Sequence, residues 1–334
     1  MSAQEDSQIL RQDTSPLIGE SLSVLCLRAE YAENANSSVF SQGIDYLHRH
    51  YEAMRRVRGD GNCFFRALIY ALCEQLLPST AREILEHQQE RKSLDMYTQT
   101  AHDRAISERQ DNIDTERIDH TCVTATAAAT SSLLTAHIQQ KIRRSKAELI
   151  ALGYSETAID TFWETFMDYL ATLFMRQSFF DNAFFRLFTV QDFQTEGGES
   201  EYLVWYARLL TAGYLKQNAD RFRPFIAGLY PGQTVEQFCS AEVEPMGKEC
   251  DQPQITALAE ALDIRVRIEY LDGRASLGSD LPHYICQSTS EENSSLRDAA
   301  IPGASEATTS ANPVITIHLL YRPGHYDILY PRLD

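Results

Sequence analysis

A helix that begins at Cys63 and is buried in the core constrains the fold of this chain more than any other feature. Beyond Cys63, apolar residues recur at steps of three and four, as on one face of a buried helix: Phe64, Leu68, Ala71, Leu72 and Leu76. The preceding Asp60-Gly61-Asn62 has the composition of a tight turn and helix N-cap, whose side chains accept hydrogen bonds from free amides. We therefore expect a core helix that starts at Cys63 and ends near Leu77-Pro78.

Cys63 is expected in or beside the first turn of this helix. Unpaired N–H groups and the helix dipole favour an anion there, and the thiolate is the nucleophilic form of cysteine. The alternative is a buried structural cysteine, because free Cys is among the most buried residue types. The turn residues directly before Cys63 favour the nucleophile.

A β-hairpin at the other end of the chain supplies partners for such a nucleophile. The apolar run 314–321 is followed by Arg322-Pro323-Gly324, a turn, and then by a second strand, 325–330. Because strand side chains alternate, His325 and Asp327 share one face, with Cα atoms about 6.5–7 Å apart. A nucleophile, a base and a residue that orients the base make the set of a cysteine hydrolase.

Several further segments resemble one known family. The chain is similar to the otubain branch of the OTU cysteine proteases from about Glu20 to Pro331. The segments that carry the resemblance, in chain order, are Asp60-Gly-Asn-Cys-Phe-Phe-Arg-Ala67, Phe166-Met-Asp168, Leu209-Leu-Thr211, Gly213-Tyr-Leu215, Val243-Glu-Pro-Met246, Lys248-Glu249, Ile268-Glu-Tyr270 and Leu320-Tyr-Arg-Pro-Gly-His-Tyr-Asp-Ile-Leu-Tyr330. One departure is Gly59, where otubains usually carry proline.

The resemblance implies a thiol-dependent isopeptidase specific for ubiquitin, with a papain-like arrangement and no metal or organic cofactor. Cys63 would be the nucleophile, His325 the base and Asp327 its orienting residue. Backbone N–H groups of the turn Asp60, Gly61, Asn62 would bind the oxyanion, and Asp60 would shape that turn. The expected partner is ubiquitin or polyubiquitin, and binding to ubiquitin-conjugating enzymes stays open. Two alternatives remain: a non-catalytic regulator that binds ubiquitin or a conjugating enzyme, and a protease for a ubiquitin-like modifier.

Composition excludes other classes of protein. The formal net charge of −17 argues against nucleic acid, which needs a concentrated basic surface, and suits a basic protein partner. No stretch approaches the roughly 20 apolar residues that span a membrane. Seven cysteines without a Cys-x-x-Cys pair favour neither a disulfide framework nor a zinc site. We expect a chain that binds no membrane and no metal and resides in the cytoplasm, with nuclear access left open.

We expect an α+β fold of the papain-like OTU type, in which a helical subdomain packs on a small antiparallel or mixed sheet formed late in the sequence. Residues 1–18 are predicted to be a flexible tail, and 19–334 one catalytic domain. This domain has a low-complexity insert at about 88–135 and a long loop at about 287–312. The other expected helices are 20–32, 38–54, 136–152, 157–177, 199–215, 234–239 and 254–262, and the other expected strands are 264–270 and 283–286.

Overall fold

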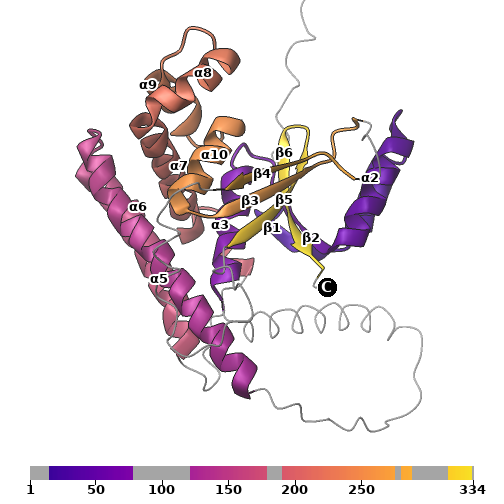
Figure 1. The fold of residues 1–334 in the computed structure, drawn as a ribbon, viewed down its shortest axis with the longest axis horizontal. Helices are drawn as coiled ribbons and strands as arrows, with labels where there is room; N and C mark the ends of the chain where they lie inside the picture. The colour runs from indigo at the N-terminus through magenta and orange to yellow at the C-terminus, as the bar shows by residue number, and fades with distance from the viewer. Residues whose placement is uncertain (1–14, 78–120, 179–189, 275–279, 288–314, 333–334) are drawn as a thin grey trace, which may run out of the picture.

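One mixed β-sheet forms the centre of the molecule (Figure 1). The structure, a computed structural model, describes residues 15–77, 121–178, 190–274, 280–287 and 315–332. Within these residues the sheet has the strand order β1-β2-β6-β5-β3-β4. The strands are β1 (Ile18–Leu22), β2 (Tyr51–Val57), β3 (Arg265–Tyr270), β4 (His283–Gln287), β5 (Thr316–Arg322) and β6 (His325–Pro331).

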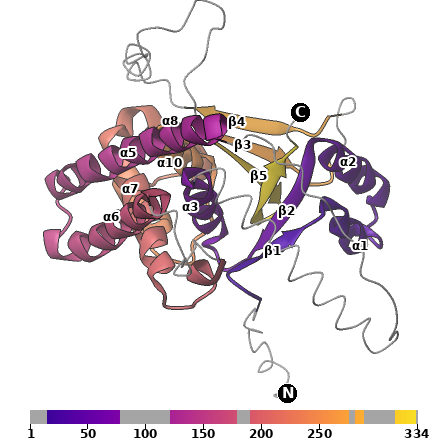
Figure 2. The same ribbon diagram turned by 90° about the horizontal axis from the view of Figure 1, so that it is seen from below.

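Helices cover both faces of this sheet (Figures 1 and 2). On one face lie α1 and α2, and on the other lies α3, with α5, α6, α7 and α10 beyond it. The helices in chain order are η1 (Val24–Cys26), α1 (Leu27–Tyr31), α2 (Ser37–His50), α3 (Cys63–Leu76), α5 (Thr121–Ala151), α6 (Glu156–Ser178), η2 (Val190–Phe193), α7 (Glu199–Gln217), α8 (Ala219–Leu229), α9 (Val235–Phe238), η3 (Cys239–Val243) and α10 (Gln252–Leu262). The expected α+β fold is confirmed.

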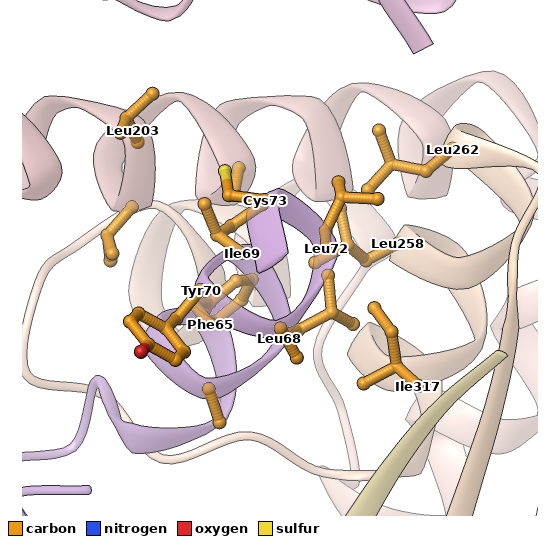
Figure 3. Close-up of a cluster of buried hydrophobic side chains, with 14 of the residues drawn as sticks. Phe65, Leu68, Ile69, Tyr70, Leu72, Cys73, Leu203, Leu258, Leu262 and Ile317 are labelled. Carbon is orange, nitrogen blue, oxygen red and sulfur yellow. The ribbon is translucent and has the colours of Figure 1, made fainter. Parts of the chain in front are cut away.

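The predicted core helix is α3, and its start and end are as expected. It begins at Cys63 and ends at Leu76, because Leu77 before Pro78 has an extended backbone. Its side chains pack against helices on one side and against Ile317 of β5 on the other (Figure 3). Twelve of its fourteen residues are buried, more than the single apolar face that the spacing indicated. This all-round burial fixes the position of the helix N-terminus relative to the sheet.

The late hairpin is confirmed, and its two strands lie in the middle of the sheet. Strands β5 and β6 pair antiparallel, with Arg322 opposite His325 and Leu320 opposite Asp327. Strand β5 also pairs in parallel with β3, and β6 pairs antiparallel with β2. The sheet is therefore mixed, and His325 at the start of β6 lies on a central strand.

Two predictions about the N-terminal region hold only in part. The helix expected at 20–32 is present at residues 24–31, as η1 and α1, but its first residues belong to β1. The helix expected at 38–54 is α2, which ends at His50, and the chain continues as β2. Pairing with β6 draws residues 51–57 into the sheet, overriding the helical spacing. The sheet is consequently built from both ends of the chain. The tail is also shorter than 1–18, because Leu17 and Ile18 are buried.

The boundaries of the insert differ from the prediction. Residues 121–135, expected in the insert, begin α5, and Ser131 and Thr135 are buried. Both hydroxyls hydrogen-bond to backbone carbonyls, which satisfies them inside a helix of low apolar content. Most of the insert and the loop predicted at 287–312 lie outside the described residues. The sequence also failed to indicate α8, which contains Pro224 and Gly228.

Candidate active site

Cys63 occupies the first position of α3, where the sequence predicted it. Its side chain is 4% exposed and lies in the main core cluster. Helix N-termini carry unpaired N–H groups, which stabilise negative charge on a nearby side chain. Burial and helix position together give Cys63 a defined orientation toward β6.

The strand alternation predicted that His325 lies beside Asp327, and the fold also brings Cys63 to it. The imidazole Nε2 lies 3.0 Å from Asp327 Oδ1, and the Cys63 side chain is close enough to affect the pKa of the ring. Because an ionised carboxylate only accepts, Nε2 is the donor, and Nδ1 is the ring nitrogen left for exchange with the thiol. The departure noted at position 59 lies beside it, since a Cβ on Gly59 would be 3.4 Å from His325 Nδ1.

The environment of His325 favours the imidazolium. Burial alone would lower its pKa, but interactions with Asp327 and Cys63 outweigh burial and raise the pKa to about 9. Asp327 is fully buried, and burial would raise its pKa, yet His325 and Arg322 hold the pKa of that carboxyl below its usual range. The site therefore favours a charged pair of imidazolium and carboxylate beside the Cys63 sulfur.

The turn that precedes Cys63 is held tightly from both sides. Gly61 has a φ of 75°, and a Cβ there would lie 2.1 Å from the carbonyl oxygen of Gly247. Glycine is therefore required for both the backbone conformation and the close approach of the neighbouring loop. Asn62 does not cap α3 through its side chain as predicted. Its Oδ1 instead accepts from the N–H of Gly247 at 2.8 Å and from Arg208.

The backbone N–H groups of the turn divide into two pairs. Asp60 N–H donates to the Arg58 carbonyl, and Asn62 N–H donates to the Asp60 carboxylate at 2.9 Å. Among the described residues, the N–H groups of Gly61 and Cys63 donate to no protein acceptor. These two amides are therefore the ones available for a developing oxyanion.

Asp60 has a structural contact that the sequence did not predict. Arg66, one turn into α3, binds its carboxylate through two nitrogens, at 2.9 and 2.6 Å. Burial would raise the pKa of Asp60, but the guanidinium outweighs burial and lowers it. The carboxylate thus shapes the turn and is held by both Arg66 and the Asn62 amide. This arrangement agrees with the turn-shaping role expected for Asp60.

Arg208 on α7 and Arg322 at the end of β5 are contacts of the site that sequence reasoning missed. Arg208 reaches the turn, and Arg322 reaches Asp327. The signal for Arg208 was present in the sequence: it falls at helical spacing with Val204, Thr211 and Leu215, which are all buried. A charged residue inside an apolar helical stripe indicates a specific buried partner.

Three further cysteine and histidine side chains do not suit this chemistry, although Cys250 interacts electrostatically with Cys63 and Arg208. Cys73 and Cys250 are buried, and burial raises the pKa of both thiols, which makes them poor nucleophiles. His318 hydrogen-bonds to the Tyr51 hydroxyl, and burial lowers its pKa to about 4, which fits a structural role. In the described part of the chain, no three His, Cys, Asp or Glu side chains are grouped to hold a metal.

The described helices also include none with the length and apolar content needed to cross a bilayer.

Comparison with known proteins places these features in a wider group. A family model described as Peptidase C65 Otubain matches residues 11–122 and 123–331. The chain is 33% identical to "Ubiquitin thioesterase OTUB1" of Homo sapiens over 316 residues, 95% of this chain and 83% of that protein. It is 29% identical to "OVARIAN TUMOR DOMAIN-containing deubiquitinating enzyme 1" of Arabidopsis thaliana over 339 residues, 99% of this chain and 87% of that protein.

A solved structure is similar over the same length. "The structure of a ceOTUB1 ubiquitin aldehyde UBC13~Ub complex" has a TM-score of 0.62 at 26% identity and covers 96% of each chain. The likeness therefore includes both ends of the chain, which together supply Cys63 and His325.

Proposed function

The chain belongs to the otubain family of cysteine peptidases and is a cysteine-type deubiquitinase, and we propose that it acts through Cys63, His325 and Asp327. The observation that carries this assignment of residues is the position of His325, which interacts with the Cys63 side chain and hydrogen-bonds to the buried Asp327. These residues come from opposite ends of the sequence and serve no common packing role. Their order is that of a nucleophile, a base and its orienting group.

In the first half of the proposed reaction, the Cys63 sulfur attacks the carbonyl carbon at the C-terminus of ubiquitin. His325 takes the thiol proton and holds it as the imidazolium, oriented by Asp327. The carbonyl oxygen becomes an oxyanion and accepts from the N–H groups of Gly61 and Cys63. When the C–N bond breaks, His325 returns the proton to the leaving lysine amine, and a thioester remains on Cys63.

In the second half, water releases ubiquitin from Cys63. His325, now neutral, takes a proton from water while the water oxygen attacks the thioester carbon. The same two amides bind the second oxyanion. Breakage of the C–S bond releases the ubiquitin carboxylic acid, which loses its proton to solvent, and the proton on His325 regenerates the pair of Cys63 and His325.

Defined ubiquitin dimers test the proposal. We expect the chain to cleave at least one isopeptide-linked dimer, and Cys63→Ala and His325→Ala to lower the rate by a factor of about 100 or more. Cleavage of a ubiquitin-like modifier with no cleavage of any ubiquitin dimer would favour the modifier protease. Ubiquitin binding without cleavage would favour the non-catalytic regulator. His318→Ala is the matched control, because His318 contacts Tyr51 and lies outside the site.

We extend the proposal to ubiquitin-conjugating enzymes as partners. Support comes from the similar solved structure, which contains UBC13~Ub together with ubiquitin aldehyde. Titration of the chain with a ubiquitin-charged conjugating enzyme, with and without free ubiquitin, measures this interaction. Saturable binding is expected, and no binding at any ubiquitin concentration would remove this partner.

The cytoplasm is the proposed location. The described cysteines Cys26, Cys63, Cys73, Cys239, Cys250 and Cys286 are free thiols, which supports a reducing compartment. Fractionation of cells that express the chain tests this proposal, and recovery in a secreted or membrane fraction would contradict it.

A further inference from the structure

Arg208 places a buried guanidinium between the Asp60–Cys63 turn and the loop that faces it. The side chain starts on α7, is 0% exposed and lies over the ring of Phe65, 4.4 Å from its centre. Its terminal nitrogens bind two oxygens of the turn, the Gly61 carbonyl and Asn62 Oδ1, each at 2.8 Å. The facing loop runs from the end of η3 to α10. The terminal nitrogens also bind two carbonyl oxygens there, those of Val243 at 3.0 Å and Lys248 at 2.8 Å.

These contacts differ from those of an ordinary buried arginine. Arg208 has no carboxylate within salt-bridge distance among the described residues, and its Nε has no hydrogen-bond partner there. Burial lowers the pKa of Arg208 to about 10. A buried cation with no carboxylate in contact is unfavourable for stability, so its presence needs a reason other than stability.

The geometry of the contacts supplies that reason. Three oxygens from the two segments converge on one guanidinium nitrogen. The Gly61 carbonyl belongs to the peptide unit whose N–H, that of Asn62, donates to Asp60. Both ends of this peptide are therefore fixed, one by Arg208 and the other by Asp60. Its rotation would turn a carbonyl toward the site and move the amides of Gly61 and Cys63.

We propose that Arg208 is a positioning residue that holds the Asp60–Cys63 turn in the form that binds the oxyanion. It acts through backbone groups and does not touch the reacting atoms. A planar fork of five donors can bind oxygens in several directions at once, whereas a lysine ammonium carries the same charge at one point. The inference rests on the proposed function, because it concerns the oxyanion formed from ubiquitin.

The Arg208→Lys variant separates position from charge. We expect kcat for an isopeptide-linked ubiquitin dimer to fall by a factor of about 10–100 with KM within about twofold, as for loss of transition-state contacts alone. Alkylation of Cys63 by iodoacetamide forms no oxyanion. Its rate should therefore stay within about twofold of that of the unsubstituted chain, and the pH midpoint of alkylation should not change. Arg55→Lys is the matched control, because Arg55 is also buried but contacts Tyr330 and Glu74. It should change the melting temperature and leave kcat within about twofold.

Two results would overturn the inference. The first is a folded Arg208→Lys variant whose kcat stays within about twofold of that of the unsubstituted chain. The second is a parallel fall of kcat and of the alkylation rate, which would indicate a general loosening of the structure around Cys63. If Arg208→Lys does not fold, Asn62→Ala decides, because it removes an oxygen that Arg208 holds while leaving the arginine in place. A folded Asn62→Ala with unchanged kcat would overturn the inference. Inactivity of the unsubstituted chain on every ubiquitin dimer would instead overturn the proposed function itself.

Discussion

Arg322 and His325 bind different oxygens of Asp327. Arg322 donates from Nε and a terminal nitrogen to Oδ2, at 3.1 and 2.6 Å, while His325 Nε2 donates to Oδ1 at 3.0 Å. The Val57 N–H adds a fourth hydrogen bond, to Oδ1 at 3.1 Å. A buried carboxylate with both oxygens occupied cannot rotate, so the imidazole is oriented by a fixed acceptor.

Replacement of this guanidinium should reduce both stability and rate. Arg322→Met removes one of the two cations bonded to the buried Asp327 carboxylate and leaves Oδ2 unpaired, which should destabilise the fold by about 3 kcal/mol. It should also lower kcat by about tenfold or more, because Asp327 can then rotate or take up a proton. Chemical denaturation and kinetics on a ubiquitin dimer measure the two effects.

Arg267→Met is the matched control for this variant. Arg267 binds the fully buried Glu269 at 2.8 Å on β3, away from Cys63. The Arg267→Met variant should lose about as much stability as Arg322→Met and keep kcat within about threefold of that of the unsubstituted chain. Equal losses of kcat in both variants would show that Arg322 acts on the fold alone.

The raised pKa of His325, about 9, predicts a specific alkaline limit for hydrolysis. The imidazolium donates the proton that the leaving lysine amine needs, so kcat/KM should fall as pH rises through about 9. This pKa lies above the unfolded value of 6.5. The charged imidazole therefore contributes its full stability to the fold below about pH 6.5, and this contribution is lost as pH rises through about 9. Alkylation of Cys63 needs only the thiolate and should not fall there. A decline of hydrolysis centred near pH 6.5 would contradict the proposed role of His325.

Substitution of Gly61 tests the close approach of the turn and the Gly247 loop. Gly61→Ala adds a methyl group where only 2.1 Å separates it from the Gly247 oxygen, at a φ of 75°. We expect a loss of about 1–2 kcal/mol from the left-handed backbone alone and a fall in kcat of about tenfold or more. Gly153→Ala is the control, with a φ of 89° and no atom within 4 Å of the added Cβ. It should show the stability loss with unchanged kcat, and equal kcat in the two variants would disprove the argument.

Local chemistry explains why much of the site could be predicted. A turn, a helix start and a strand alternation place Cys63, His325 and Asp327 through short-range rules, and the fold needed only to bring them together. Strand β2 was missed because its pairing with β6 is a long-range contact, which overrides the helical spacing of residues 51–54, and β1 was missed because it depends on pairing with β2.

The arginines around the site could not be assigned from local rules. Arg66, Arg208 and Arg322 act through oxygens that lie elsewhere in the sequence or across the turn. Their partners follow from tertiary packing, and the predicted capping role of Asn62 failed for the same reason. Its side chain is used by Arg208 and Gly247 in place of the helix amides.

The central claim is that Cys63 is an activated nucleophile positioned for the ubiquitin C-terminus. The most direct measurement mixes the chain with ubiquitin that carries a C-terminal thiol-reactive group, and locates the adduct by peptide mass spectrometry. The account predicts one adduct, on Cys63, that Cys63→Ala abolishes and Cys250→Ala retains. An adduct on another cysteine, or none in a chain that binds ubiquitin, would contradict it.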